Sequence, residues 1–151
     1  MEKYRLVEER KRVGETDEVL PNEVRITQQG KPRNYITYAM NLLAHGSRGT
    51  DGNPHGVDQI VLKAMGRAVN KAVTIAEILK RKAPLHQITE LSSVELMDIY
   101  EPLEEGLDVV ESKRYVSCMT ITLSKSPLDT TNIGYQVSAK IKSLVHQIHF
   151  A

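Results

Sequence analysis

Hydrophobic and polar positions along the chain follow two periods, one typical of strands and the other typical of helices. Strict alternation or a short apolar run indicates a strand, and apolar residues three and four positions apart indicate a helix. These patterns predict elements in the order β-α-β-α-β-β, at residues 23–27, 33–45, 57–64, 67–82, 85–100 and 114–124. Turn signals agree with these limits, because Gly30-Lys31-Pro32 precedes the first helix and Pro84 ends the second.

Each predicted element has an apolar side that needs a partner to bury it. In the second helix that side is formed by Val69, Ala72, Val73, Ala76 and Leu79. The last strand alternates most clearly, and with the long strand before it predicts a hairpin whose turn region at 101–111 is acidic. Together the elements predict an α/β two-layer sandwich with a long hairpin between the last two strands.

The chain divides into three parts. Residues 1–21 are charged and have little apolar periodicity, so we expect a flexible N-terminal arm. Residues 22–126 contain all the predicted elements and form one domain. Residues 127–151 are a C-terminal extension, in which apolar residues at helical spacing between Ile141 and Ile148 predict a short helix.

Composition narrows the class of protein. The chain has 151 residues, of which 40% are hydrophobic and 26% are charged, as in a soluble globular domain. No stretch approaches the ~18 consecutive apolar residues of a transmembrane helix. Cys118 is the only cysteine, so no internal disulfide can form, and we expect a cytoplasmic or nuclear location.

Charge is distributed unevenly, although the net charge is only +1. Residues 23–82 contain ten basic and four acidic side chains, whereas residues 83–112 contain eight acids and no base. Such runs are often only solvated surface, and that interpretation stays open. The other interpretation is that the basic segment binds a polyanion.

The basic residues of that segment gather where a strand passes into a helix. Lys31 and Arg33 belong to the first junction, and Lys63, Arg67 and Lys71 belong to the second. If both junctions lie at one edge of the sheet, these five cations converge beside two helix N-termini, whose N–H groups suit phosphate oxygens. Contacts of this kind release counterions and hold nucleic acid without reading its sequence.

Uncharged side chains near the junctions fit the same role. Asn34 and Asn70 could donate hydrogen bonds to sugar or phosphate, and an ordinary amide on a helix surface is an equal alternative. Tyr38 could stack on a base, whereas Tyr35 is expected to pack in the core.

The sequence contains no familiar catalytic motif. It has no nucleophile elbow, phosphate-binding loop or zinc-protease pattern. Two histidine pairs, His45 with His55 and His146 with His149, have no acidic cluster or cysteine beside them, and Cys118 lies in a predicted strand, where packing is the simpler role. We therefore predict a binding protein rather than an enzyme, without metal or cofactor.

Two stretches carry a resemblance to a known family. Residues 30–36, GKPRNYI, follow the first strand, and residues 60–73, IVLKAMGRAVNKAV, span the second strand and the start of the second helix. Together they resemble the Alba family of chromatin and RNA-binding proteins. The similarity is to the eukaryotic, plant-type branch related to the small protein subunits of RNase P and MRP, and it covers about residues 22–125.

The resemblance implies a fold like the C-terminal domain of translation initiation factor three. It implies a dimer, formed either by identical chains or with another Alba-like chain. It also implies that Lys31, Lys63, Arg67 and Lys71 bind DNA or RNA together with a hairpin arm.

Three departures from archaeal members affect the expected ligand. Met65 stands where a basic residue is common, and Ala83 replaces a bulky aromatic that packs between dimers on DNA. The hairpin tip is acidic where archaeal arms are basic, so phosphates repel it, although Lys113 and Arg114 on its far side compensate in part. These departures favour RNA over duplex DNA.

We therefore predict a dimeric RNA-binding protein that holds the phosphate backbone through a basic surface and acts in RNA metabolism or translation. One alternative is a scaffold subunit of a ribonucleoprotein that pairs with another Alba-like chain. A second alternative is a chromatin-associated DNA-binding protein.

Overall fold

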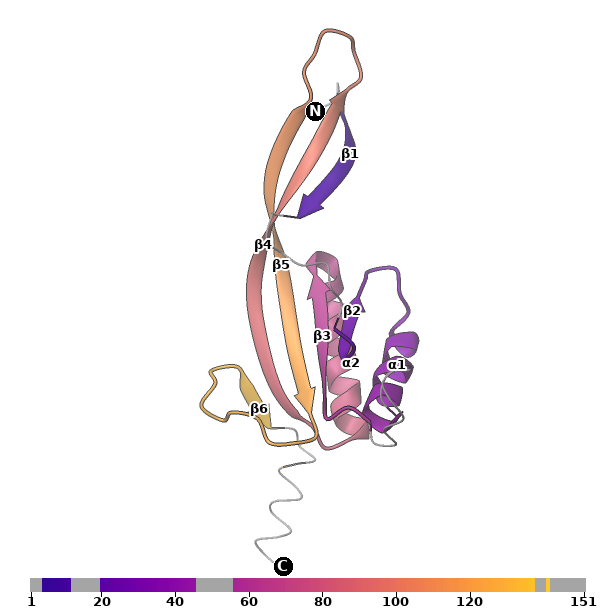
Figure 1. The fold of residues 1–151 in the computed structure, drawn as a ribbon, viewed down its shortest axis with the longest axis vertical. Coiled ribbons are helices and arrows are strands. Elements are labelled where there is room, and N and C mark those ends of the chain that lie inside the picture. The colour runs from indigo at the N-terminus through magenta and orange to yellow at the C-terminus, as the bar shows by residue number, and fades with distance from the viewer. Residues whose placement is uncertain (1–3, 12–19, 46–55, 138–140, 142–151) are drawn as a thin grey trace, which may run out of the picture. The chain divides into compact units, whose positions relative to one another are not determined.

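The computed structural model describes residues 4–11, 20–45, 56–137 and 141 (Figure 1). The chain forms two compact units. The core unit comprises Val19–Leu91 and Cys118–Ala151, and the hairpin unit comprises Met1–Glu18 and Ser92–Ser117. The two longest strands, β4 (His86–Pro102) and β5 (Val110–Ser124), contribute residues to both units.

A mixed sheet forms one layer of the core unit. Its shorter strands are β2 (Glu23–Ile26), β3 (Gln59–Met65) and β6 (Tyr135–Val137). The strand order is β1-β4-β5-β3-β2, where β1 (Tyr4–Lys11) belongs to the hairpin unit, and β6 pairs with β4. β2 and β3 run parallel, whereas β3 runs antiparallel to β5. The C-terminal ends of β2 and β3 therefore lie at the same edge of the sheet.

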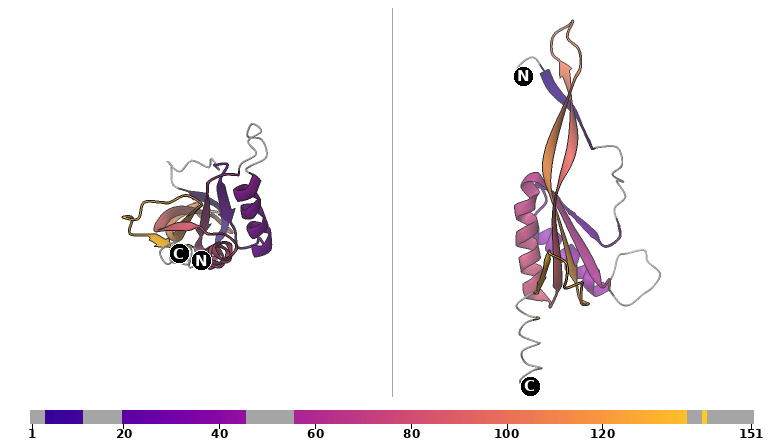
Figure 2. Two further views of the ribbon diagram at one scale, coloured as in Figure 1. Left: turned by 90° about the horizontal axis from the view of Figure 1, so that it is seen from below. Right: turned by 90° about the vertical axis from the view of Figure 1, so that its left-hand side faces the viewer.

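Two helices of 14 residues, α1 (Pro32–His45) and α2 (Val69–Lys82), form the second layer (Figure 2). A short 3-10 helix, η1 (Gly66–Ala68), leads from β3 into α2. Alternate residues of β3, namely Ile60, Leu62 and Ala64, are buried in the same cluster as the helices. Among the described residues, no helix combines the length and the apolar character needed to cross a bilayer.

The core lies between the two helices and one face of the sheet. Small side chains, Ala39 in α1 with Ala72 and Ala76 in α2, allow the helices to approach their neighbours closely. Larger side chains fill the remaining space, and the fully buried ones are Leu42, Ile60, Leu62, Ile75, Leu79, Leu85, Ile121 and Leu123. Their removal from water drives the association of the layers. The predicted α/β two-layer sandwich is confirmed.

The predicted order of elements is also confirmed, and the structure adds two strands. β1 lies within the segment expected to be a flexible arm, and it pairs antiparallel with β4. β6 pairs with residues 86–88 of β4 and lies in the expected C-terminal extension. The helix expected between Ile141 and Ile148 falls, apart from Ile141, outside the described residues. The division of the chain at residues 21 and 126 stays a prediction.

The buried side of α2 differs from the predicted stripe at one position. Val73 was expected to be buried but is 43% exposed, whereas Ile75 is completely buried. Apolar residues on this helix occupy two adjacent faces, and the face with the alanines is the one buried in the core. Ile75 shares that face with Ala72 and Ala76, and Val73 lies outside it.

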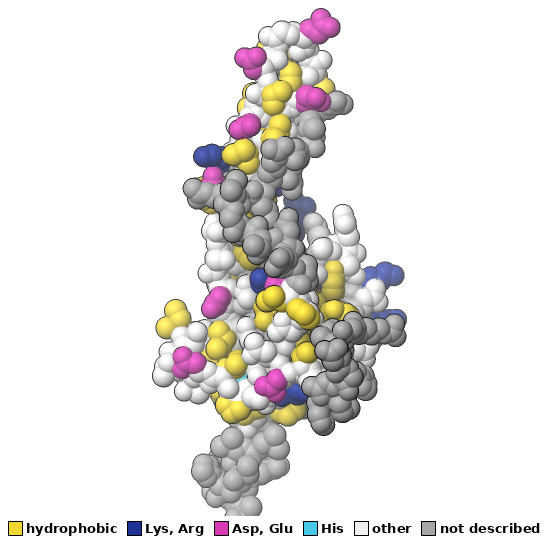
Figure 3. Space-filling model, in the orientation of Figure 1, with side chains coloured by type: hydrophobic (Ala, Val, Ile, Leu, Met, Phe, Trp, Pro, Cys, Tyr) yellow, Lys and Arg dark blue, Asp and Glu magenta, His cyan; other side chains and the backbone are white. Residues whose placement is uncertain are grey.

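The hairpin unit contains β1 and residues 92–117, which include the turn between β4 and β5. In this turn Gly106 has a φ of +88°, in the left-handed region that favours glycine. Acidic and apolar side chains are exposed together here: Leu103, Glu104, Glu105, Leu107, Asp108 and Val109 (Figure 3). The predicted long hairpin with an acidic turn is confirmed.

Candidate nucleic-acid interface

The two strand-to-helix junctions meet at one edge of the core unit, which we call the junction edge. β2 leads into a turn at residues 27–31, the first turn, and the parallel strand β3 leads into η1. Lys71 of α2 connects the two directly. Its ammonium nitrogen lies 3.0, 2.6 and 2.6 Å from the carbonyl oxygens of Thr27, Gln28 and Gly30, and donates a hydrogen bond to each.

Tyr35 in α1 fixes the first turn from another side. Its hydroxyl accepts a hydrogen bond from the Thr27 backbone N–H at 3.0 Å and shares a second with Thr27 Oγ1 at 3.0 Å. Thr27 Oγ1 also accepts a hydrogen bond from the Gly30 N–H at 3.3 Å. Burial would raise the pKa of Tyr35, but these hydrogen bonds and the charge of Lys71 outweigh it and lower the pKa. The ring packs against the core, which confirms the role expected for Tyr35.

The second junction depends on a glycine. Gly66 has a φ of +57°, which lets β3 turn into η1 and leaves Arg67 exposed. Neither η1 nor α2 has a side-chain cap at its N-terminus. The N-terminal helical turns of α1 and α2 contain no acidic residue. The positive ends of both helix dipoles therefore lie at the junction edge without an acidic side chain in the helix to neutralise them.

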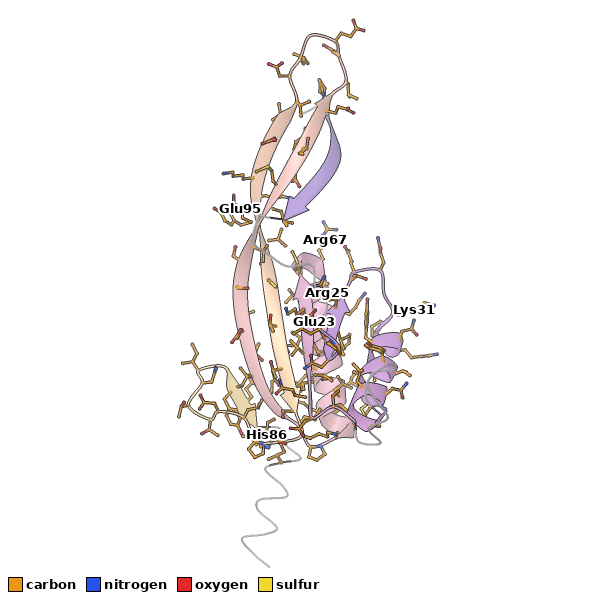
Figure 4. All side chains as sticks on the ribbon, in the orientation of Figure 1. Glu23, Arg25, Lys31, Arg67, His86 and Glu95 are labelled. Atoms are coloured by element: carbon orange, nitrogen blue, oxygen red, sulfur yellow. The ribbon has the colours of Figure 1, made fainter. Side chains whose placement is uncertain are left out.

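Three cations at the junction edge have no partner among the described residues. They are Lys31, Arg33 and Arg67, and all three are exposed. Figure 4 shows Lys31 and Arg67 with their side chains directed away from the core. Together they give the edge a positive charge that no described acidic side chain offsets.

The uncharged candidates are also exposed. Asn34 and Asn70 lie in the N-terminal helical turns of α1 and α2. Tyr38, one helical turn after Asn34, is 49% exposed. Their side chains make no hydrogen bond with any described residue. This exposure fits a contact with sugar or phosphate as well as an ordinary surface position.

Lys63 differs from the free cations because it has an internal partner. It lies on the face of β3 away from the helices, and its nitrogen is 2.6 Å from Glu23 Oε1. Arg25 Nε lies 3.2 Å from the other oxygen of Glu23, whose side chain is only 1% exposed (Figure 4). Burial would raise the pKa of Glu23, but hydrogen bonds and charges from Lys63 and Arg25 outweigh it and lower the pKa. The Glu23 carboxylate thus offsets the positive charge of Lys63, which the sequence analysis assigned to nucleic-acid binding.

Lys113 and Arg114 lie in the hairpin unit and face acidic residues of β4. Arg114 Nε is 2.6 Å from Asp98 Oδ2, and Asp98 is buried. Lys113 Nζ is 3.7 Å from Glu95 Oε1, a longer and more exposed pair. Their contact with nucleic acid stays a prediction.

The residues considered for metal or nucleophilic chemistry are scattered. Cys118 is partly buried and lies opposite Met65 in the sheet. His45 is the last residue of α1, and His55, His146 and His149 lie outside the described residues. Within the described ranges, no three His, Cys, Asp or Glu side chains are grouped to hold a metal ion.

Comparison with known proteins identifies the family. The Alba family model matches residues 22–95, which include both junctions. The DNA/RNA-binding protein ALBA1 of Plasmodium falciparum is 36% identical over 116 residues, and the Ribonuclease P protein subunit p25-like protein of Mus musculus is 36% identical over 117. The chain belongs to the Alba family. The resemblance seen in the residues around the two junctions is thereby confirmed.

The match to these Alba relatives covers 76% of this chain in each case. It covers 43% of the Plasmodium protein and 66% of the mouse protein, so the chain spans less than two thirds of either relative. Among solved structures, ALBA1 from Trypanosoma brucei aligns with a TM-score of 0.44 and 14% identity, over 87% of this chain and 82% of that chain.

Sequence reasoning missed the contacts that hold the Alba junctions together. Lys71 lies four residues after Arg67, and that spacing indicated a shared exposed face rather than a contact with the first turn. Glu23 opens a strand, and its pattern gives no sign that it is buried between two cations. The hydrogen bonds of Lys71 and the ion pair of Glu23 with Lys63 join residues distant in the chain, so no local pattern reveals them.

Proposed function

We propose that this Alba protein binds nucleic acid, with RNA favoured over DNA, by holding the phosphate backbone at the junction edge. The contacts assigned to this role are the cations Lys31, Arg33 and Arg67 and the neighbouring side chains Asn34, Tyr38 and Asn70. In this proposal the protein acts as a dimer in RNA metabolism or translation.

The observation that carries the proposal is the meeting of unpaired cations from two separate junctions. Lys31 ends the first turn and Arg33 lies at the start of α1, whereas Arg67 comes from η1. Concentrated positive charge attracts phosphates, and binding releases the counterions around them. The N–H groups at the two helix N-termini add donors that suit phosphate oxygens.

The preference for RNA rests on the acidic hairpin turn. The Plasmodium relative is named as binding both DNA and RNA, and the mouse relative is named as similar to a ribonuclease P subunit. In this chain Glu105 and Asp108 are exposed at the hairpin turn. A duplex has a higher density of phosphate charge than a single strand, so acidic side chains disfavour the duplex more.

Fluorescence anisotropy with one labelled sequence, as single-stranded RNA and as duplex DNA, tests the proposal. We expect the RNA to bind more tightly, with affinity falling steeply between about 50 and about 200 mM salt. Lys31→Ala and Arg67→Ala should each weaken binding to all sequences and lower the salt slope by about one. Lys82→Ala removes an exposed cation from the opposite end of α2 and should leave binding unchanged. Absence of salt-dependent binding at micromolar protein would refute the proposal.

A second candidate function is that of an assembly subunit in a ribonucleoprotein, paired with another Alba-like chain. The mouse relative's name favours it, and so do the exposed Leu103, Leu107 and Val109 beside the acids of the hairpin turn. Size-exclusion chromatography with light scattering separates the two candidates. A stable homodimer weakens the need for a different partner, whereas a monomer supports the assembly role.

A further inference from the structure

We propose that Lys71 is a positioning residue: it holds the first turn in the conformation that presents Lys31, and its ammonium donates no hydrogen bond to nucleic acid. The proposal rests on the proposed function of the junction edge. It changes the role of a residue that the sequence assigned to phosphate contact.

All the donors of Lys71 are already engaged. A lysine ammonium has three N–H groups and no acceptor. Three carbonyl oxygens, from Thr27, Gln28 and Gly30, lie within 3.0 Å of its nitrogen. A phosphate oxygen could therefore bind Lys71 only by displacing part of the first turn.

The same three contacts decide which way the peptide groups of the first turn face. The described chain contains no cis peptide bond, and in a trans peptide the C=O and N–H groups point in opposite directions. Because the carbonyls of Thr27, Gln28 and Gly30 face Lys71, the N–H groups of the residues that follow them point away from it. Without the ammonium, three unsatisfied carbonyl oxygens would be free to turn outward and repel a phosphate.

Lys71 acts on the turn and not on the core. Among the described residues, the hydrogen bonds of its side chain all go to the first turn, whose residues Thr27 to Gln29 are exposed. On the other side of the turn Tyr35 holds Thr27, so the turn is held between two side chains from two helices. Loss of Lys71 should therefore loosen the first turn and leave the packing of Leu62 and its neighbours intact.

Amide hydrogen exchange in the free protein tests the hold on the turn without any nucleic acid. We expect Lys71→Met to speed exchange of the Thr27 and Gly30 amides by about tenfold or more, the scale of one hydrogen bond to a charged group. The Leu62 amide in β3 should keep its exchange rate. Lys82→Met removes the same charge from the other end of α2 and should leave the exchange rates of all three amides unchanged. Unchanged exchange in Lys71→Met would overturn the proposal.

Binding to single-stranded RNA tests the link to Lys31 through a double-mutant cycle. If Lys71 acts through the turn, Lys31→Ala costs much less affinity in the Lys71→Met background than in the wild type. Arg67→Ala, which lies on the other junction, should cost the same in both backgrounds. The proposal would be contradicted if Lys31→Ala reduced affinity by the same factor in the wild type and in Lys71→Met. It would also be contradicted if Arg67→Ala lost its effect in Lys71→Met as fully as Lys31→Ala does.

Lys71→Arg separates a positioning role from a charge contact. Arginine keeps the charge and binds phosphate well, but its planar fork cannot supply three donors that converge on three carbonyls. We expect fast exchange in the first turn and weak RNA binding in Lys71→Arg; wild-type values of both would overturn the proposal. If the wild type binds no RNA, the proposed function fails, while the exchange data still decide whether Lys71 holds the turn.

Discussion

At the scale of single residues, Gly30 shows how tightly the first turn is built. A Cβ at this position would overlap the hydroxyl and ring carbons of Tyr35. The ring cannot move aside without breaking both hydrogen bonds to Thr27. We expect Gly30→Ala to lower the free energy of unfolding by about 1–3 kcal/mol and to weaken RNA binding, as measured by urea unfolding and anisotropy.

Gly106→Ala is the matched control for this substitution. Gly106 has a φ of +88° and no atom near its Cβ position, so alanine there costs about 1–2 kcal/mol through backbone strain alone. It should leave the first turn and RNA binding unchanged. If Gly30→Ala also kept wild-type RNA affinity, the first turn would have no part in binding.

Glu23 predicts a pH dependence of stability. Its pKa is lower in the folded protein than the ordinary value of 4.5, so its stabilising effect is complete above that pH. The effect is lost as pH falls through the lowered pKa, when the carboxylate that binds Lys63 and Arg25 takes up a proton. We expect Glu23→Gln to lower the free energy of unfolding by about 1–2 kcal/mol at neutral pH, with a smaller difference in acid.

Urea unfolding from neutral pH to below the usual glutamate range measures this difference. Glu90→Gln provides the control, because Glu90 is an exposed acid of the same unit with no partner among the described residues. A Glu23→Gln curve that stayed parallel to the wild type at every pH would show that Glu23 does not titrate differently in the folded state.

At the scale of elements, the face that α2 buries determines which substitutions matter. Ile75 is fully buried, and Ile75→Ala should cost about 2–4 kcal/mol, because it leaves a cavity in the core. Val73 is 43% exposed, and Val73→Ala should change stability by no more than about 0.5 kcal/mol. Thermal or urea unfolding of the two variants separates them. The opposite ranking would place Val73, as the sequence predicted, on the buried side.

The helices and most strands could be predicted because burial of one face leaves a local period in the sequence. That period could not decide between two adjacent apolar faces of α2, since the choice depends on which face the tertiary structure buries. β1 could not be predicted, because its residues show no clear alternation of apolar and polar side chains. Hydrogen bonding between the backbones of β1 and β4 requires no such alternation. The expected fold places the two junctions together. The contact of Lys71 with Gly30 and that of Glu23 with Lys63 depend instead on how distant segments pack and on the register of β2 against β3, which no local pattern shows.

At the scale of the whole molecule, opposite charges are divided between regions of the chain. Residues 23–82 contain ten bases and four acids, whereas residues 92–117 of the hairpin unit contain seven acids and two bases. Nucleic acid that approaches the protein therefore meets attraction from one region and repulsion from another. In the proposed function, the balance between them sets how strongly a densely charged duplex is disfavoured relative to a single strand.

Removing acids from the hairpin turn tests this balance. Glu105→Gln combined with Asp108→Asn should raise affinity for duplex DNA by about two- to fivefold at low salt, with a smaller gain for single-stranded RNA. The control is Asp58→Asn with Glu90→Gln, which removes two exposed acids from the core unit. Anisotropy titrations of the wild type and both double variants with each ligand measure these gains. Equal gains in the two double variants would mean that net charge alone matters, and the preference for RNA would then need a source other than the hairpin.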